Sequence, residues 1–398
     1  MKIRCRGALC AAALAIFLSG CSPLWEREVY EREPHLTQED SGALTANSYD
    51  SLKSVIIGVI RSGLSEADIR VTDYPGELTS LSLSALLNEI QTREPIGAYA
   101  VEYMAYASAR VLSQYTVSLT IVYKRDTLPV ISPVSGGREL EQAVRSALRA
   151  YRPLLTVEMP YYYAQDHDVE RMVRAYYYSD PAWAMEYPAA AAALYPPSGE
   201  SLRRIVELEL TYKNPPGELR RKTRDTEARA ERLLQSLPVF SPDGDEERLA
   251  RTVLWLRDAL CSEVRYDNDT AMLAAATEER QGGDPYTAYG ALVSGLAVSE
   301  GHAMAFKLLC DKLEIDCLVV TGLWGGFDHA WNLVRIGDIW YHLDAALDNR
   351  GPVPTYNFFL FDDETAILET FVPDKSAYPA ALPGPWSYEA LTAPEESG

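Results

Sequence analysis

The chain has 398 residues, which is long enough for two or three domains that each bury a core of their own. Hydrophobic residues make up 47% of it and charged residues 24%, as in ordinary folded globular proteins. The formal net charge of −20 argues against nucleic acid as a partner, because phosphate binding needs a basic surface. The same charge suits a soluble body held away from an anionic membrane.

The first 20 residues have the pattern of a bacterial export signal, with three basic residues before an apolar run at 7–18. The run is too short for a spanning helix, which needs roughly 20 apolar residues. The next sequence, Leu18-Ser19-Gly20-Cys21, resembles the lipobox of bacterial lipoproteins. That resemblance implies cleavage before Cys21 and attachment of membrane lipid to its thiol. An ordinary secretory signal with a chance cysteine is the alternative. We expect a lipid anchor on the extracytoplasmic face of the cell membrane.

Residues 21–49 are polar, lack an apolar period and predict a tether. Residues 50–126 and 135–214 then show the same order of helices and strands, which predicts a duplicated α/β two-layer region. Their closing segments are similar, and from Lys124 to Lys213 the shift is 89 residues. The expected helices are 52–62, 81–93, 140–151 and 168–177, and the expected strands are 67–74, 99–106, 115–124, 154–160, 183–187 and 204–213.

The sequence Asn214-Pro215-Pro216-Gly217 predicts a domain boundary. A charged helical connector is expected at 217–240, a last domain at 243–382 and a flexible tail at 383–398. Three cysteines, Cys261, Cys310 and Cys317, remain once the signal and Cys21 are set aside, too few for a disulfide framework. Buried free thiols are expected, with a Cys310–Cys317 bridge as the alternative.

Five motifs follow one another in the last domain. They are Val264-Arg265-Tyr266-Asp267, Tyr289-Gly290-Ala291-Leu292, Ala297-Val298-Ser299-Glu300-Gly301-His302-Ala303, Asp328-His329-Ala330-Trp331-Asn332-Leu333-Val334 and Trp340-Tyr341-His342-Leu343-Asp344. In this order and spacing they resemble the bacterial transglutaminase-like family, which has the papain-like thiol-enzyme fold. The resemblance covers about a third of the chain and implies an α+β fold for this domain. It places Ser299, His329 and Asp344 at the positions of a catalytic triad.

The residues support the same constellation without the family. Ser299 precedes an expected helix, whose N-terminus offers unpaired N–H groups and the positive end of the dipole. A hairpin is expected at 329–344 with its turn at Gly337-Asp338, which places Asp344 opposite Trp331. His329 then lies on the same face as Asp344, roughly 7–8 Å away along the backbone diagonal, within side-chain reach.

The family has a cysteine where this chain has Ser299, and this departure puts activity in doubt. A cysteine beside a histidine and a helix end ionises easily, whereas a serine acts only if His329 removes its proton during attack. One interpretation is that Ser299 is a helix N-cap in an inactive or repurposed site. The alternative is a Ser299-His329-Asp344 acyl-transfer enzyme that acts on amide or ester bonds.

Three further residues are candidates for a binding cleft: Trp331, His302 and Tyr289. Surface positions are the simpler expectation for His302, and a packed or exposed position for His342. No metal or nucleotide motif is present in the sequence, so we expect no cofactor. The leading hypothesis is a lipid-anchored, catalytically inactive surface module that binds peptide, protein or cell-wall material. The acyl-transfer enzyme and a purely structural stalk are the alternatives.

Overall fold

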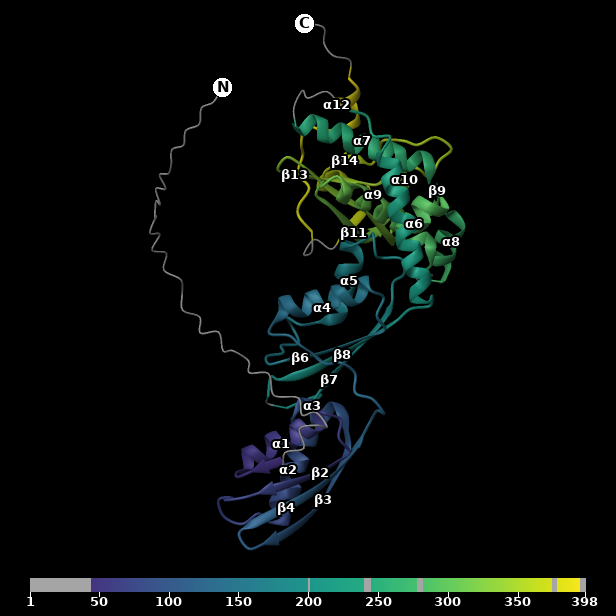
Figure 1. Ribbon diagram of the computed structural model, residues 1–398. Coiled ribbons are helices and arrows are strands. Elements are labelled where there is room, and N and C mark those ends of the chain that lie inside the picture. The colour runs from purple at the N-terminus through teal and green to yellow at the C-terminus, as the bar shows by residue number, and fades with distance from the viewer. Residues whose placement is uncertain (1–43, 200, 240–244, 278–281, 374–377, 394–398) are drawn as a thin grey trace, which may run out of the picture.

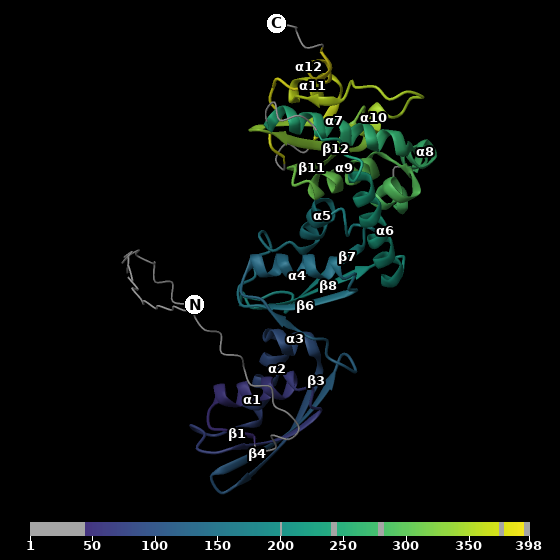
Figure 2. The same cartoon turned by 45° about the horizontal axis from the view of Figure 1, so that its top comes forward.

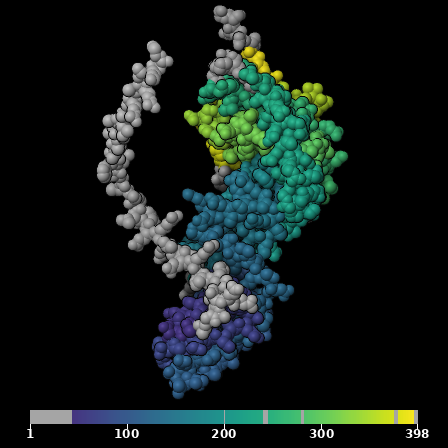
Figure 3. Space-filling model, viewed as in Figure 1, coloured from purple at the N-terminus to yellow at the C-terminus, as the bar shows by residue number. Residues whose placement is uncertain are grey.

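The computed structural model describes residues 44–199, 201–239, 245–277, 282–373 and 378–393. The expected signal peptide, Cys21 and most of the tether lie outside these ranges. Figures 1 and 3 show three compact parts arranged end to end, with the N-terminal sheet at one end and the C-terminal domain at the other. No helix in the described ranges is both long enough and apolar enough to cross a membrane.

The first part is a four-stranded sheet in the order β1-β2-β4-β3, covered by helices. Strands β1 and β2 are parallel, and the other pairs are antiparallel. Alternate residues of β4 are buried, as expected for a sheet with one covered face. The elements are β1 Leu44–Ala46, α1 Tyr49–Arg61, β2 Glu66–Val71, α2 Ser80–Arg93, α3 Pro95–Ala100, β3 Val101–Val111 and β4 Gln114–Tyr123. The predicted tether ends too late, because β1 pairs with β2 and belongs to the sheet.

The second part has a sheet in the order β5-β6-β8-β7, with the same parallel, antiparallel, antiparallel sequence of pairings. Its helices α4 and α5 lie on the face toward the C-terminal domain (Figure 2). The elements are β5 Ser132–Pro133, α4 Gly137–Arg149, β6 Leu154–Met159, α5 Val169–Ser179, β7 Ala189–Tyr195 and β8 Arg204–Thr211. The predicted helices and strands of both parts are present in the predicted order along the chain, apart from one misplaced strand, and β1, β5 and α3 are additional.

The strand expected at 183–187 is wrong, because the chain turns there and the strand is β7, Ala189–Tyr195. Alanine favours helices and gives no period-2 pattern, so the sequence conceals this strand. Pro188 and Pro196 bound the segment, and antiparallel pairing with β8 fixes it as an edge strand. Tertiary pairing outweighs local propensity here.

The C-terminal domain follows the connector helix α6, Pro216–Leu234. It consists of a five-stranded antiparallel sheet in the order β14-β13-β12-β11-β15, with α9 packed on β11 and β12, and α7 packed on α9. The remaining elements are α7 Asp245–Glu263, β9 Arg265–Tyr266, α8 Asn268–Thr277, a π-helix Gly290–Ser294, β10 Leu296–Ala297, α9 Ser299–Lys312, β11 Cys317–Trp324, β12 Phe327–Ile336, β13 Ile339–Leu343, α10 Ala345–Asp348, β14 Phe359–Phe361, α11 Asp363–Leu368, β15 Phe371–Pro373 and α12 Tyr388–Thr392. The whole chain is thus α+β.

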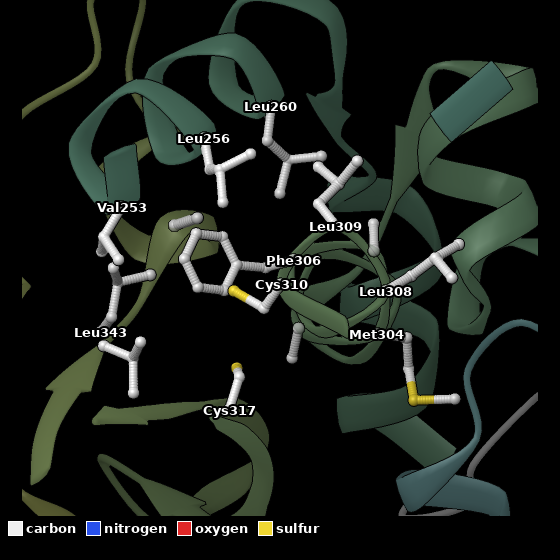
Figure 4. Packing of buried hydrophobic residues seen from close by; sticks show 14 of the residues in the cluster. Val253, Leu256, Leu260, Met304, Phe306, Leu308, Leu309, Cys310, Cys317 and Leu343 are labelled. Atoms are coloured by element: carbon white, nitrogen blue, oxygen red, sulfur yellow. The ribbon is translucent and has the colours of Figure 1, made fainter. Parts of the chain in front are cut away.

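The core of this domain lies between α7, α9 and the sheet (Figure 4). Phe306 and Leu309 of α9 face Leu256 and Leu260 of α7, and all four are fully buried. Cys310 and Cys317 are buried free thiols whose sulfur atoms point toward each other in Figure 4. Burial and a hydrogen bond with Cys317 raise the pKa of the Cys310 thiol well above its usual value.

The tail expected to be flexible from residue 383 is structured up to residue 393. Tyr388 of α12 stacks on Tyr356 with 3.6 Å between ring centroids, and Leu391 is buried beside α7. Arg251 of α7 donates to the carbonyl of Leu391 at 3.1 Å. Helix α12 is therefore part of the domain, and this part of the prediction is wrong.

Candidate active site

Ser299 is the first residue of α9, and Val298, not Ser299, occupies the N-cap position. The predicted interpretation of Ser299 as an N-cap is therefore wrong. The residue is buried, with 7% of its surface exposed. Ser299 nevertheless lies at the N-terminus of α9, as the sequence predicts, close to the N–H groups of the first helical turn.

His329 and Asp344 form the hydrogen bond that the sequence predicts. Nε2 of His329 lies 2.5 Å from Oδ2 of Asp344, and both side chains are buried. The hairpin register pairs Asn332 with Leu343 and Ile336 with Ile339, as expected. Asp344 is also the N-cap of α10 and accepts the N–H of Leu347 at 2.9 Å. Because Nε2 faces the carboxylate, Nδ1 is the imidazole atom left for other chemistry.

Trp331 lies beneath His329, with their rings stacked at 5.9 Å, and is only 1% exposed. A residue this buried cannot form the surface of a cleft, so its predicted binding role is wrong. Its indole N–H donates to Nδ1 of His342 at 2.9 Å. Since indole is a donor only, Nδ1 of His342 is unprotonated and Nε2 donates to Asp363 at 2.9 Å. The packed position weighed for His342 is the observed one.

His302 is also buried, at 1% exposure, so the expectation of a surface position is wrong. Its Nδ1 donates to the carbonyl of Val298 at 3.0 Å, which leaves Nε2 without a proton in the neutral ring. Nε2 is buried and has no partner among the described residues. Burial lowers the pKa of His302, and the nearby Asp344 carboxylate opposes this while His329 adds to it. The ring lies 6.0 Å from that of Tyr266.

Tyr289 lies apart from these residues. Its ring packs against the connector helix α6, where Nζ of Lys222 lies 5.4 Å from the ring centroid. It also borders a small cluster formed by Tyr151, Met185 and Leu219. The structure therefore uses Tyr289 at the junction of the second part and the C-terminal domain, and does not bring it to His329.

None of the three described cysteines takes the place of a cysteine nucleophile at position 299. Cys261 directs its thiol to the carbonyl of Ala345 at 3.5 Å, and burial raises its pKa to about 12. Cys310 and Cys317 face each other in the core. No group of three or more His, Cys, Asp and Glu side chains in the described part of the chain is arranged for a metal ion.

A groove of about 900 Å³ is lined by α7, β9 and the segment after α10, and none of the residues predicted for the site lines it. Tyr266 lines it and also contacts His302. Arg350 forms another part of the wall, with its guanidinium between the rings of Tyr266, at 4.7 Å, and Trp324, at 5.3 Å. The Trp324 ring lies 6.0 Å from that of His329. The groove therefore adjoins the site through Arg350 and two aromatic rings.

Only Val264, Arg265 and Tyr266 of the groove lining belong to a sequence motif, so the motifs do not indicate a groove. Arg350 follows α10, and Trp324 ends β11, so the two lie far from Tyr266 in sequence. An arginine after a short helix and a tryptophan at a strand end are ordinary in a sequence. Only the folded chain places them over one another.

No protein-family model matches the sequence, and no curated protein matches it. Among solved structures, a transglutaminase is 12% identical over 57% of this chain, with a TM-score of 0.25; this chain spans 60% of its length. A candidate cysteine protease from Cytophaga hutchinsonii is 13% identical over 48% of this chain and 70% of its own, with a TM-score of 0.24. Both likenesses are weak, and neither bears on the activity of this chain.

Proposed function

We propose that this chain is a lipid-anchored extracytoplasmic protein whose transglutaminase-like C-terminal domain is inactive and binds a peptide, protein or cell-wall ligand. The observation that supports inactivity most directly is at Ser299. The chain has a serine where the family that it resembles has a cysteine. A thiol beside a histidine and a helix start ionises before attack, whereas a serine hydroxyl needs a base to take its proton during attack.

The groove beside the site supports the binding role. Its volume of about 900 Å³ lies within the range of roughly 300–1,000 Å³ that is typical of ligand sites. It combines the aromatic rings of Tyr266 and Tyr356 with arginine side chains. Rings supply contact area, and charged groups orient a ligand. This combination suits a peptide better than an apolar metabolite.

The two N-terminal sheets support a role as a spacer between anchor and binding domain. We propose that they arose by duplication, because their strand order and their pattern of parallel and antiparallel pairs agree. Arg61 of the first part pairs with Glu158 of the second at 2.8 Å. Tyr99 donates to Glu207 across the same junction at 2.7 Å. These bonds hold the spacer together and keep the C-terminal domain at a distance from the membrane end.

Retention of randomised peptides on the immobilised chain tests the binding function. Bound peptides would be eluted and identified by mass spectrometry, with the chain unfolded in urea and then immobilised as the control. We expect selective retention by the folded chain. If folded and unfolded chains retain the same peptides, the binding function is wrong.

The second candidate function is acyl transfer through Ser299, and the buried His329–Asp344 pair favours it. The pair orients an imidazole with Nδ1 available, which is the requirement for a general base. Labelling of Ser299 by a fluorophosphonate distinguishes the two functions, as described at the end of the Discussion.

A further inference from the structure

Arg350 lines the groove and packs against the rings of Tyr266 and Trp324. Its guanidinium carbon lies 4.7 Å from the ring centroid of Tyr266 and 5.3 Å from that of Trp324. One guanidinium nitrogen also donates to the hydroxyl of Tyr266 at 3.4 Å. Two aromatic rings and a hydrogen bond limit the motion of this exposed side chain, which lowers the entropy lost when it binds a ligand.

Among the described residues, the contacts found for the Arg350 guanidinium are the rings of Tyr266 and Trp324 and the Tyr266 hydroxyl, and none of them is a carboxylate. Arg257, in the same groove, shows the contrast, because it pairs with Asp258 at 2.7 Å and Asp348 at 3.2 Å. Arg265 also lines the groove. Asp258 is the one acidic residue in the lining of the groove. In a chain with a net charge of −20, this groove is a local basic region.

The indole N–H of Trp324, whose ring packs against Arg350, is a buried donor without a partner among the described residues. A carboxylate has two acceptor oxygens, so it suits the N–H donors of Arg350. A peptide supplies a carboxylate at its C-terminus or on an acidic side chain.

We propose that Arg350 binds a carboxylate of a peptide ligand in this groove, with Tyr266 and Trp324 holding the guanidinium in place. The planar guanidinium presents two parallel N–H donors that match the two oxygens of a carboxylate. This inference rests on the proposed binding function and names its ligand as a peptide with a free carboxylate.

The test uses two libraries of N-acetylated hexapeptides with neutral side chains, one with free C-terminal carboxylates and one with C-terminal amides. The purified chain selects from each library, and the affinity of the retained peptides is measured by calorimetry. We expect the carboxylate form to bind at least about tenfold more tightly than the amide, because the pair of an arginine with a carboxylate is a charge-assisted, two-pronged hydrogen bond.

The variant Arg350→Gln should lose this preference, and Arg350→Lys should keep only part of it because lysine lacks the two-pronged geometry. Arg110→Gln is the matched control. Arg110 is an exposed arginine over a tyrosine ring in the first part, with 5.3 Å between its guanidinium and Tyr115. The Arg110→Gln variant should bind the peptides like the unaltered chain. All variants should unfold at the same temperature.

Three results would overturn the inference, and they differ in what else they overturn. Equal affinity for the carboxylate and amide forms would show that Arg350 does not recognise the carboxylate, but it would leave the peptide-binding function standing. Displacement of the peptide by inorganic phosphate at equal concentration shows a general anion site in place of a peptide-carboxylate site. Retention of neither library by the folded chain overturns the binding function and the inference together.

Discussion

Nε2 of His329 lies 2.5 Å from Oδ2 of Asp344, although Asp344 also caps helix α10 through its other carboxylate oxygen. One buried carboxylate therefore fixes both an imidazole and a helix start. This double use gives the pair a structural role that persists without any reaction. The presence of the His329–Asp344 pair alone therefore does not indicate catalysis.

Replacement of Asp344 by alanine should destabilise the domain. The change leaves His329 buried without its partner and removes the cap from the N–H of Leu347. We expect a loss of about 2–4 kcal/mol in the free energy of unfolding, from an unsatisfied buried group and a lost cap. Urea denaturation measures it. Asp338→Ala, at the exposed turn of the same hairpin, is the control and should change stability by less than about 0.5 kcal/mol.

Replacement of Trp331 by alanine should act through folding. The side chain is 1% exposed and packs against His329 and Phe371, with ring centroids 5.9 Å and 5.0 Å away. Loss of such a ring costs about 3–5 kcal/mol. Phe327→Ala, at the exposed start of the same strand, should have little effect. Thermal unfolding compares them, and an unchanged midpoint for Trp331→Ala would count against its place in the core.

His302 should make the chain less stable in acid. Burial lowers its pKa below the usual 6.5, so the folded chain binds fewer protons than the unfolded chain as the pH falls through this value. The free energy of unfolding should therefore decrease below pH 6.5 and level off above it. His302→Phe should flatten this dependence between pH 7 and 5. Equal pH slopes for the variant and the unaltered chain would show that His302 does not titrate in this way.

A cysteine introduced at position 299 should have a reactive thiol. At the first position of α9, a thiol meets the N–H groups of the helix start, which lower its pKa into the range of about 3.5–7.5 when a histidine is close. Iodoacetamide should then modify Ser299→Cys at a rate that changes little between pH 6 and 9. Cys261, Cys310 and Cys317 are buried and should stay unmodified in the folded chain.

Ser262→Cys is the matched control for that experiment, since residue 262 is exposed near the end of α7. Its alkylation should rise about tenfold per pH unit below the ordinary thiol pKa of about 8.5. If the two variants have the same pH profile, the site around residue 299 no longer lowers a thiol pKa.

The elements with clear periodicity were predictable from the sequence. Alternation in β4 and the apolar stripe of α9 indicated their positions, and the turn at Gly337-Asp338 fixed the hairpin register. That register places His329 and Asp344 on one face of the hairpin, where the structure shows their hydrogen bond. By contrast, β7 was misplaced because its alanines carry no alternation, and its position depends on pairing with β8.

Burial was the property that the sequence predicted least well. Trp331 and His302 were placed at a cleft or on the surface, yet both are 1% exposed. Histidine and tryptophan occur both inside and outside proteins, so their type alone does not decide. The groove at Arg350 was missed for a related reason: it is formed by residues from separate elements that share no pattern.

The most direct test of the inactive, ligand-binding account is the reaction of Ser299 with a fluorophosphonate probe. The folded chain would be treated, and its intact mass read beside that of Ser299→Ala. The account predicts no adduct in either protein, because a serine hydroxyl does not ionise beside a histidine and a helix start as a cysteine thiol does. A single adduct on the unaltered chain that disappears in Ser299→Ala would contradict it and establish an activated serine.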